Sequence, residues 1–299
     1  MKTKILLTSA GGLTGVFLTK HLSKYKDIEI YCIDMTKNNP LQKWTHNVYL
    51  CPSTSSTEYS NYIKQFVKEH SIDIIIPVTS YDVEFFSKKS NQNLIKEVKM
   101  LIIDEQINLI LSNKESCYLY LRSLGIKTPF IYNNGNIDFP CFIKPFIGSG
   151  SKNAIKVDSI EDYNYWNRKL GNSLVTEYLE GSEYTVDCLF DLDYKCIGYN
   201  TRERVKTTSG GATITQNVEI DGVNSIIAKL ESTKKIIGPV NFQFKLIDKN
   251  LVVFDFNTRL ASGGLPLTVY TDLDIPRKII DILLGQKPKK FIRETKRLG

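Results

Sequence analysis

Histidine is scarce in this sequence and paired cysteine is absent, and both facts exclude chemistries. The chain of 299 residues has three histidines, His21, His46 and His70, and none after them. Catalysis by an imidazole, or by a zinc ion that histidine holds, is therefore not expected in the second half. The six cysteines form no C-x-x-C pair, so we expect reduced, mostly buried thiols rather than a zinc framework.

Long apolar runs and dense basic patches are also lacking. No run approaches the roughly 18 apolar residues of a membrane helix, and the short run after Lys4 falls below the roughly 7–15 residues of a signal-peptide core. The net charge of +7 is scattered, with one dense stretch between Lys287 and Arg297. We expect a cytoplasmic protein that binds small anions, with no nucleic-acid or membrane partner.

The first part of the chain alternates between strand and helix patterns. The third expected strand is apolar, as parallel strands buried on both faces are, and strands alternate with helices, so a doubly wound α/β sheet is expected up to about residue 112. The expected elements are strands over 4–9, 29–33 and 73–78 and helices over 16–24 and 57–70. Next, we expect a helix capped by Ser112 with Glu115 and stopped by Gly125.

A glycine loop near the N-terminus allows two interpretations. Gly11-Gly12-x-x-Gly15 followed by Asp34 resembles a dinucleotide fingerprint, which would indicate an NAD(P)-dependent oxidoreductase. The match is imperfect, because the first spacing is G-G rather than G-x-G. Tyr165 and Lys169 have the spacing of a catalytic pair, but they lie in an expected surface helix. We prefer a Rossmann-shaped unit that does not bind a dinucleotide.

Two short segments of the second half suggest a nucleotide site. A strand over 141–144 carries Lys144, and a loop of small residues follows it. Backbone N–H groups of such a loop can close over phosphates, and the lysine can neutralise their charge. Further on, Glu177, Glu180 and Glu183 bracket a turn where a carboxylate could accept ribose hydroxyls. Ordinary hairpin turns are the alternative for both segments.

Residues 238–264 give the strongest pattern, a hairpin with strands over 240–246 and 251–257. Asp255, Asn257 and Arg259 share one strand face, while Phe254 and Phe256 are expected to face the core. Carboxylate and amide oxygens suit Mg²⁺, and arginine suits phosphate. We expect Gln243 opposite Asp255 and Asn241 opposite Asn257, with an odd-length turn centred on Lys249.

Taken in order, these segments resemble the ATP-grasp superfamily, most closely the modules of carbamoyl-phosphate synthase large subunits and related stand-alone carboxylate-amine ligases. The matching motifs are Asn113-Lys114, Gly125-Ile126-x-Thr128-Pro129, the Lys144 strand and its loop, Glu177-Tyr-Leu-Glu-Gly-x-Glu183, and Asn241-Phe-Gln243 with Asp255-Phe-Asn-Thr-Arg259. The resemblance implies an α/β fold, α+β in its second half. A Rossmann-like pre-grasp domain (1–112) would precede a two-lobed ATP-grasp domain (113–299), whose smaller, nucleotide-covering lobe spans about 125–180.

The resemblance also implies a role for each site residue. The phosphates of ATP would lie near Lys114, Lys144 and the loop Gly148, Ser149, Gly150 and Ser151. The base and ribose would contact Glu177, Tyr178, Leu179 and Glu183. Magnesium, or manganese in its place, would bind Gln243, Asp255 and Asn257. Catalysis would use Arg259 and Asn257, and Arg202 and Arg204 would bind substrate.

The implied reaction activates a carboxylate as an acyl phosphate, which an amine or similar nucleophile then attacks to give ADP and phosphate. Both substrates would be small molecules, and a homodimer is one assembly open to the chain. Two departures stand out: relatives usually have glutamate where Asp255 stands, and the chain has room for one module only. Because of the shorter acid, a non-catalytic nucleotide-binding relative is a second alternative, beside the oxidoreductase. Because of the single module, carbamoyl phosphate synthesis by this chain alone is not expected.

Overall fold

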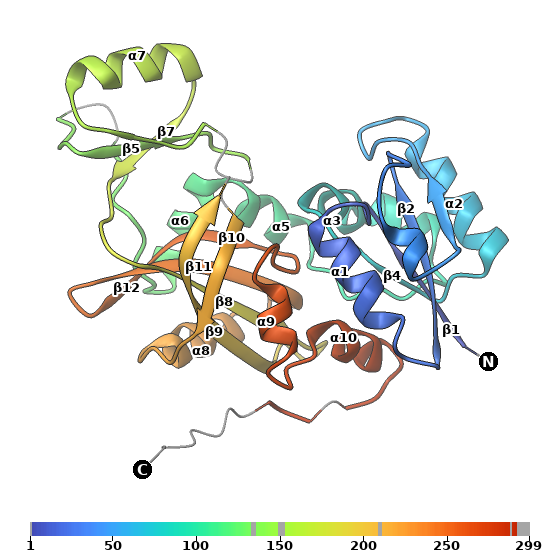
Figure 1. The fold of residues 1–299 in the computed structure, drawn as a ribbon. Helices are drawn as coiled ribbons and strands as arrows, with labels where there is room; N and C mark the ends of the chain where they lie inside the picture. The colour runs from blue at the N-terminus through green and yellow to red at the C-terminus, as the bar shows by residue number, and fades with distance from the viewer. Residues whose placement is uncertain (1, 133–135, 149–152, 209–210, 288, 292–299) are drawn as a thin grey trace.

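The N-terminal part contains a parallel sheet. In this computed structural model, residues 2–132, 136–148, 153–208, 211–287 and 289–291 are described. The strands lie in the order β3-β2-β1-β4, all parallel. The sequence predicts a parallel sheet but neither this order nor β3; β1, β2 and β4 are labelled in Figure 1. They are β1 (Thr3–Leu7), β2 (Ile28–Asp34), β3 (Val48–Leu50) and β4 (Ile74–Ile76). The helices are α1 (Leu13–Leu22), η1 (Leu41–Lys43), α2 (Tyr59–His70), α3 (Ser80–Ser87) and α4 (Lys89–Leu94).

Two helices, α5 (Glu105–Ser112) and α6 (Lys114–Ser123), follow the sheet. The expected cap is wrong by one residue, because Ser112 ends α5 and Asn113 caps α6. The Asn113 side-chain oxygen accepts hydrogen bonds from the backbone N–H groups of Glu115 and Ser116, which is the usual work of an N-cap asparagine. Gly125 follows α6 with a φ of 69°, as expected for a helix stop.

A separate small lobe stands above the rest of the molecule in Figure 1. It consists of the three-stranded sheet β6-β5-β7 and helix α7 (Ile160–Leu170). Its strands are β5 (Cys141–Lys144), β6 (Ile155–Val157) and β7 (Leu174–Glu177). The lobe has its own apolar cluster, which includes Cys141, Ile143, Val157 and Val175. It is therefore an independently packed layer over the neighbouring sheet.

The largest sheet is antiparallel, in the order β10-β9-β8-β11-β12. Its strands are β8 (Glu183–Phe190), β9 (Cys196–Thr208), β10 (Gly211–Asn217), β11 (Gly238–Ile247) and β12 (Asn250–Asn257). One face, with Val186, Phe242 and Phe256, is buried in a cluster with residues of α5, α6 and α8 (Val223–Ser232). The opposite face carries the polar residues of the motifs, so it is free to line a site.

The β11–β12 hairpin confirms the predicted register where it matters and corrects the predicted turn. Gln243 lies opposite Asp255 and Asn241 opposite Asn257. The turn has two residues, Asp248 and Lys249, both with positive φ, so an odd-length turn is wrong. A register shift after Gln243 reconciles the two findings, because it leaves one extra residue on β12.

That extra residue is Phe254, and its predicted place in the core is also wrong. Phe242, Phe244 and Phe256 are buried together, whereas Phe254 is half-buried and lines a cavity. The bulge turns the Phe254 side chain out of the core while Asp255 keeps its position opposite Gln243.

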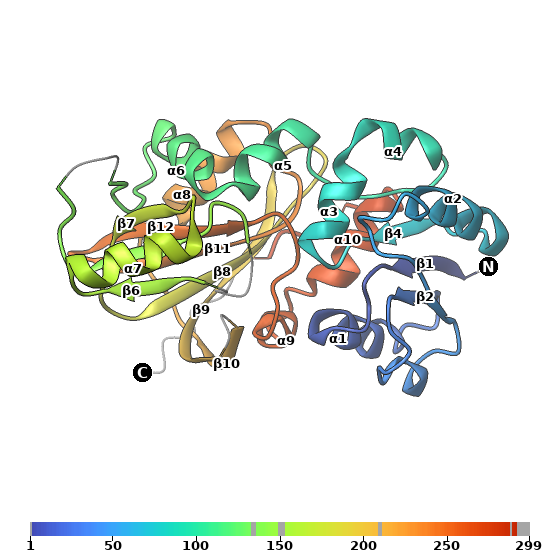
Figure 2. The same cartoon turned by 90° about the horizontal axis from the view of Figure 1, so that it is seen from above.

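The C-terminal helices return to the N-terminal sheet. After α9 (Leu265–Val269), helix α10 (Ile275–Leu283) packs beside α1 (Figure 2). Residues of α10 and of β1, β2 and β4 belong to one buried apolar cluster. Polar contacts also join α10 to the N-terminal part. His21 Nε2 of α1 lies 2.8 Å from the carboxylate of Asp274, the N-cap of α10, and Arg277 forms an ion pair with Asp27 at 2.8 Å. The two parts of the chain therefore share a core.

Candidate functional site

A cavity of about 730 Å³ is bounded by the small lobe, the polar face of the large sheet and the start of α1. The structure brings together in its lining every described residue to which the resemblance gives a role in the site. These are Lys114, Lys144, Gly148, Glu177, Tyr178, Leu179, Glu183, Arg202, Arg204, Gln243, Asp255, Asn257 and Arg259. Ser149, Gly150 and Ser151 lie outside the described residues.

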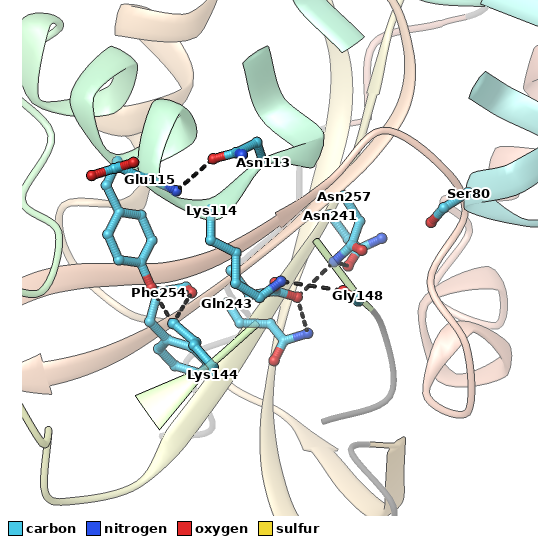
Figure 3. Close-up of polar contacts among 12 residues, drawn as sticks. Ser80, Asn113, Lys114, Glu115, Lys144, Gly148, Asn241, Gln243, Phe254 and Asn257 are labelled. Carbon is cyan, nitrogen blue, oxygen red and sulfur yellow. Dashed lines mark hydrogen bonds and ion pairs between the residues drawn. The ribbon is translucent and has the colours of Figure 1, made fainter. Parts of the chain in front are cut away.

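Asp255 is the acid at the centre of this site. Its carboxylate accepts hydrogen bonds from Asn257 Nδ2 at 2.8 Å and Gln243 Nε2 at 3.2 Å, and Lys114 Nζ lies 3.4 Å away. Figure 3 shows Lys114, Gln243 and Asn257 converging on this point. Burial alone would raise the pKa of Asp255, but Lys114, the Asn257 hydrogen bond and Lys144 bring it below its ordinary value. The group is therefore a carboxylate at neutral pH.

The residues around Asp255 fit a hard divalent cation. Gln243, Asp255 and Asn257 place oxygen-bearing side chains on one face of the hairpin, and Mg²⁺ takes oxygen ligands. Asn241, which the sequence analysis did not assign to the metal set, extends it, because its oxygen accepts from Asn257 at 3.3 Å. Among the described residues no group of three or more His, Cys, Asp or Glu side chains gathers to hold a metal, here or elsewhere, so Asp255 is the one acid of this set and the other oxygens come from amides.

The Gln243 amide is engaged by an arginine as well. Its oxygen accepts a hydrogen bond from Arg204, whose guanidinium also lies 3.1 Å from Glu183. The amide nitrogen, not the oxygen, faces Asp255. A half-turn of this amide would direct its oxygen to a cation beside Asp255, at the loss of the Arg204 contact.

Lys144 is more buried than its place beside a loop suggests. Its residue is 5% exposed, and its ammonium donates to the Tyr118 hydroxyl and, at 3.4 Å, to the Phe254 carbonyl. Tyr118 donates to the same carbonyl at 2.6 Å. Burial, followed by repulsion from Lys114, lowers the pKa of Lys144 to about 7. Tyr118 was missed from the sequence, although it lies one helical turn after Lys114 on α6.

Arg202 and Arg204 lie two residues apart on β9 and therefore point to the same face of the sheet. Arg202 pairs with Asp187, and Arg204 pairs with Glu183. Arg202 forms a two-pronged pair with Asp187 at 2.8 and 3.3 Å, and both side chains are only 3% exposed. Gly264 makes room for this guanidinium, since a Cβ there would lie 2.0 Å from it. Arg202 therefore reaches the cavity only at its edge, with its orientation fixed by Asp187.

Arg259 links the two halves of the chain at the cavity. Its guanidinium donates to Ser80 Oγ at 3.0 Å, to the Leu260 carbonyl at 2.9 Å and to Asn257 Oδ1 at 3.5 Å. These partners are all neutral. The positive charge of Arg259 has no hydrogen-bonded acid among the described residues, so it is available to an anion.

The N-terminal glycine loop uses its own acid. Asp34 accepts hydrogen bonds from the backbone of Gly11 at 2.7 Å and of Thr36 at 3.0 Å. Tyr165 and Lys169 lie on α7 of the small lobe, a helix with no buried residue. Both supports of the dinucleotide interpretation are therefore accounted for by local structure. Among the described residues, no helix combines the length and apolar character needed to cross a membrane.

Comparisons with known proteins agree with this geometry. Residues 169–298 match the family model described as "ATP-grasp in the biosynthetic pathway with Ter operon", and residues 5–101 match the "PylC-like, N-terminal domain".

Among solved structures, the biotin carboxylase domain of Hydrogenobacter thermophilus 2-oxoglutarate carboxylase is similar at TM-score 0.76 and 15% identity, covering 96% of this chain and 71% of that one. N5-carboxyaminoimidazole synthetase from Staphylococcus aureus is similar at TM-score 0.75 and 14% identity, and the match covers 96% of this chain and 79% of that one. L-amino acid ligase from Bacillus licheniformis is similar at TM-score 0.72 and 14% identity, and the match covers 95% of this chain and 74% of that one. At these identities the likeness establishes the fold.

Proposed function

We propose that this chain, an ATP-grasp protein by its fold and by its two family matches, is an ADP-forming ligase that activates a small carboxylate. An amine or similar nucleophile then displaces phosphate from the acyl phosphate. The similar structures include a carboxylase domain, an N5-carboxyaminoimidazole synthetase and an L-amino acid ligase, which supports this class of reaction.

One observation carries the proposal: a single cavity places basic side chains that have no hydrogen-bonded acid among the described residues beside one oxygen-rich acid site. Lys144 and Arg259 have only neutral hydrogen-bond partners among the described residues. Asp255 is the acid that their charges and Lys114 face. The other two acids of the lining are engaged, Glu177 by the Phe130 backbone and Glu183 by Arg204. An anionic ligand bound together with a divalent cation fits this cavity, because the anion would contact the basic side chains and the cation would contact Asp255.

The positions of the residues support a proposed role for each. Lys114 and Lys144 bind the phosphates of ATP, and Lys144 gains a proton as it does so. Arg259 steadies the phosphoryl group as it passes to the carboxylate, because it is held between Asn257 and Ser80 at the junction of the two parts. Mg²⁺, held by Asp255, Asn257 and Gln243, would supply charge neutralisation on the phosphate oxygens.

Arg202 and Arg204 are assigned to the substrate end. Arg204 contacts both Gln243 and Glu183. If the Gln243 oxygen were to hold the cation, Arg204 would keep its pair with Glu183, which is proposed to receive the ribose. Glu177, Tyr178 and Leu179 border the base, and the small lobe excludes water from the phosphates. The proposal places the protein in the cytoplasm, where ATP is available and free thiols stay reduced. A homodimer remains to be tested by sedimentation.

The test is ADP release from MgATP in the presence of pooled carboxylates and amines. We expect release that depends on one acid and one nucleophile and that Arg259→Ala abolishes. Tight MgATP binding without ADP release in any pool of carboxylates and amines would favour the non-catalytic alternative. That alternative rests on Asp255, which is shorter than the glutamate usual at this position. Binding of NAD(P)H in place of ATP would contradict both.

A further inference from the structure

Lys245 makes contacts that none of the motif assignments explains. It lies on β11, two residues beyond Gln243 on the same strand face, and its side chain is 12% exposed. Its ammonium donates to the backbone carbonyl of Leu179 at 2.7 Å and lies 3.7 Å from Glu183 Oε1. It also stands 5.4 Å from the centre of the Tyr178 ring. One side chain thus contacts two neighbouring residues of the turn after β7 and the first residue of β8.

That turn, residues 178–182, joins β7 of the small lobe to β8 of the large sheet. Lys245 and Glu183 are cross-strand partners in the register of β11 and β8, so their ion pair alone is an ordinary feature of a sheet. The bond to Leu179 is different, because it reaches past the sheet to the backbone of the connection. Nothing in strand pairing requires it.

The two oxygens of Glu183 are held from two sides. Arg204 lies 3.1 Å from Oε2 and Lys245 lies 3.7 Å from Oε1. A carboxylate has about four lone-pair sites, so Glu183 fixed in this way can still accept a hydroxyl. The pair of cations therefore sets the direction of the carboxylate without using up its capacity.

We propose that Lys245 is a positioning residue for the base and ribose of the bound nucleotide, an inference that rests on the proposed function. It fixes the backbone at Leu179 and the carboxylate of Glu183 relative to β11. Gln243 is on the same strand. Strand β11 would therefore fix the position of the base and ribose through Lys245 and that of the phosphates and their cation through Gln243. Lys245 acts through these groups.

The chain offers a matched control in Lys156. Its ammonium also lies near the Tyr178 ring, at 5.0 Å, but its ion pair is with Asp158 and its side chain is 42% exposed. Lys156→Met removes the same charge from the same neighbourhood without releasing the 178–182 backbone or Glu183.

The experiment measures, by calorimetry, the Kd of ADP and of inorganic tripolyphosphate, both with Mg²⁺. For Lys245→Met we expect ADP to bind about tenfold more weakly, the usual effect of losing one charged hydrogen bond, with tripolyphosphate within about twofold. Lys156→Met should leave both unchanged, and Lys245→Arg should restore most of the ADP affinity. If Lys245→Met does not fold, Lys245→Gln serves, with the same expectation.

Equal weakening for the two ligands would show that Lys245 contributes only charge, and no weakening would show that it positions nothing. Either result overturns the inference while the proposed function stands. An unaltered protein that does not bind ADP removes the proposed function itself, and the inference with it.

Discussion

Lys144 is a buried amine whose charge state depends on what fills the cavity. Burial lowers its pKa to about 7 in the folded protein. The ordinary pKa of a lysine is 10.5. Between pH 7 and that value the unfolded chain binds a proton at Lys144 that the folded chain does not, so the free energy of unfolding rises with pH across this window. We expect the free energy of unfolding to increase from pH 7 to pH 9, and Lys144→Met to flatten that slope. Urea titrations at three pH values test this, and equal slopes would contradict it.

Phosphate beside Lys144 should restore its proton. An opposite charge favours the ammonium form, so ADP binding at pH 8 should take up close to one proton from solution. Calorimetry in buffers of different ionisation enthalpy measures this uptake. Lys144→Met should abolish the dependence on buffer, and a parent protein without such dependence would mean that the amine and the phosphates do not meet.

Asp255 is the one carboxylate of the proposed metal set, so its removal has a specific effect. Asp255→Asn keeps the shape but removes the charge, and we expect at least about a tenfold loss of apparent Mg²⁺ affinity in the presence of ADP. The measurement is the extra rise in Tm that Mg²⁺ gives over ADP alone. Asp158→Asn, at a surface ion pair, is the control. A full Mg²⁺ effect in Asp255→Asn would remove this carboxylate from the metal site.

At the scale of elements, the β11–β12 hairpin shows what a sequence can predict and what it cannot. Gln243 opposite Asp255 follows from the requirement that polar and apolar side chains separate onto two faces. The turn length does not follow, because a bulge at Phe254 changes the register between the site and the turn. The partner of Lys144 was equally hidden, since Tyr118 reaches it from a different element.

The turn itself invites a stabilising change. Asp248 and Lys249 have φ of 46° and 63°, values that suit Asn-Gly in a two-residue hairpin turn. We expect Asp248→Asn with Lys249→Gly to raise the free energy of unfolding by up to about 1 kcal/mol, without a change in ADP affinity. Relief of the left-handed strain at Lys249, roughly 1–2 kcal/mol for an L-residue, exceeds the roughly 0.4–1 kcal/mol that a glycine costs through the more flexible unfolded chain. Denaturant midpoints measure the gain. A loss of stability would mean that the two native side chains make contacts more valuable than the relief of backbone strain.

For the whole molecule, alternating strands and helices were enough to predict the parallel sheet, and the order of the motifs was enough to predict the ATP-grasp fold. The sequence did not predict how the N-terminal part packs against the rest of the chain. Arg259 reaching Ser80, and His21 reaching Asp274, join residues far apart in sequence. Such pairs leave no local pattern.

Ligand binding should stabilise the whole chain. At 100 times its Kd, MgADP should add about 2.7 kcal/mol to the free energy of unfolding, seen as a rise in Tm, while NADH and NADPH at the same concentration should add nothing. Arg259→Ala should reduce the rise with MgATP more than with MgADP, because Arg259 is proposed to face the transferred group. A rise with a dinucleotide alone would remove the nucleotide assignment.

The shared core also sets an order of events during synthesis. Strand β4 ends at Ile76, whereas α10, which buries the same apolar cluster, begins at Ile275. At roughly 5–20 residues per second, the ribosome needs about 10–40 s to make the segment between them. For that time the nascent N-terminal sheet lacks the helix that belongs beside α1, and its apolar surface is open to chaperones and to other chains. Of the helices that the structure describes, the last to be made is thus the one that closes the first sheet.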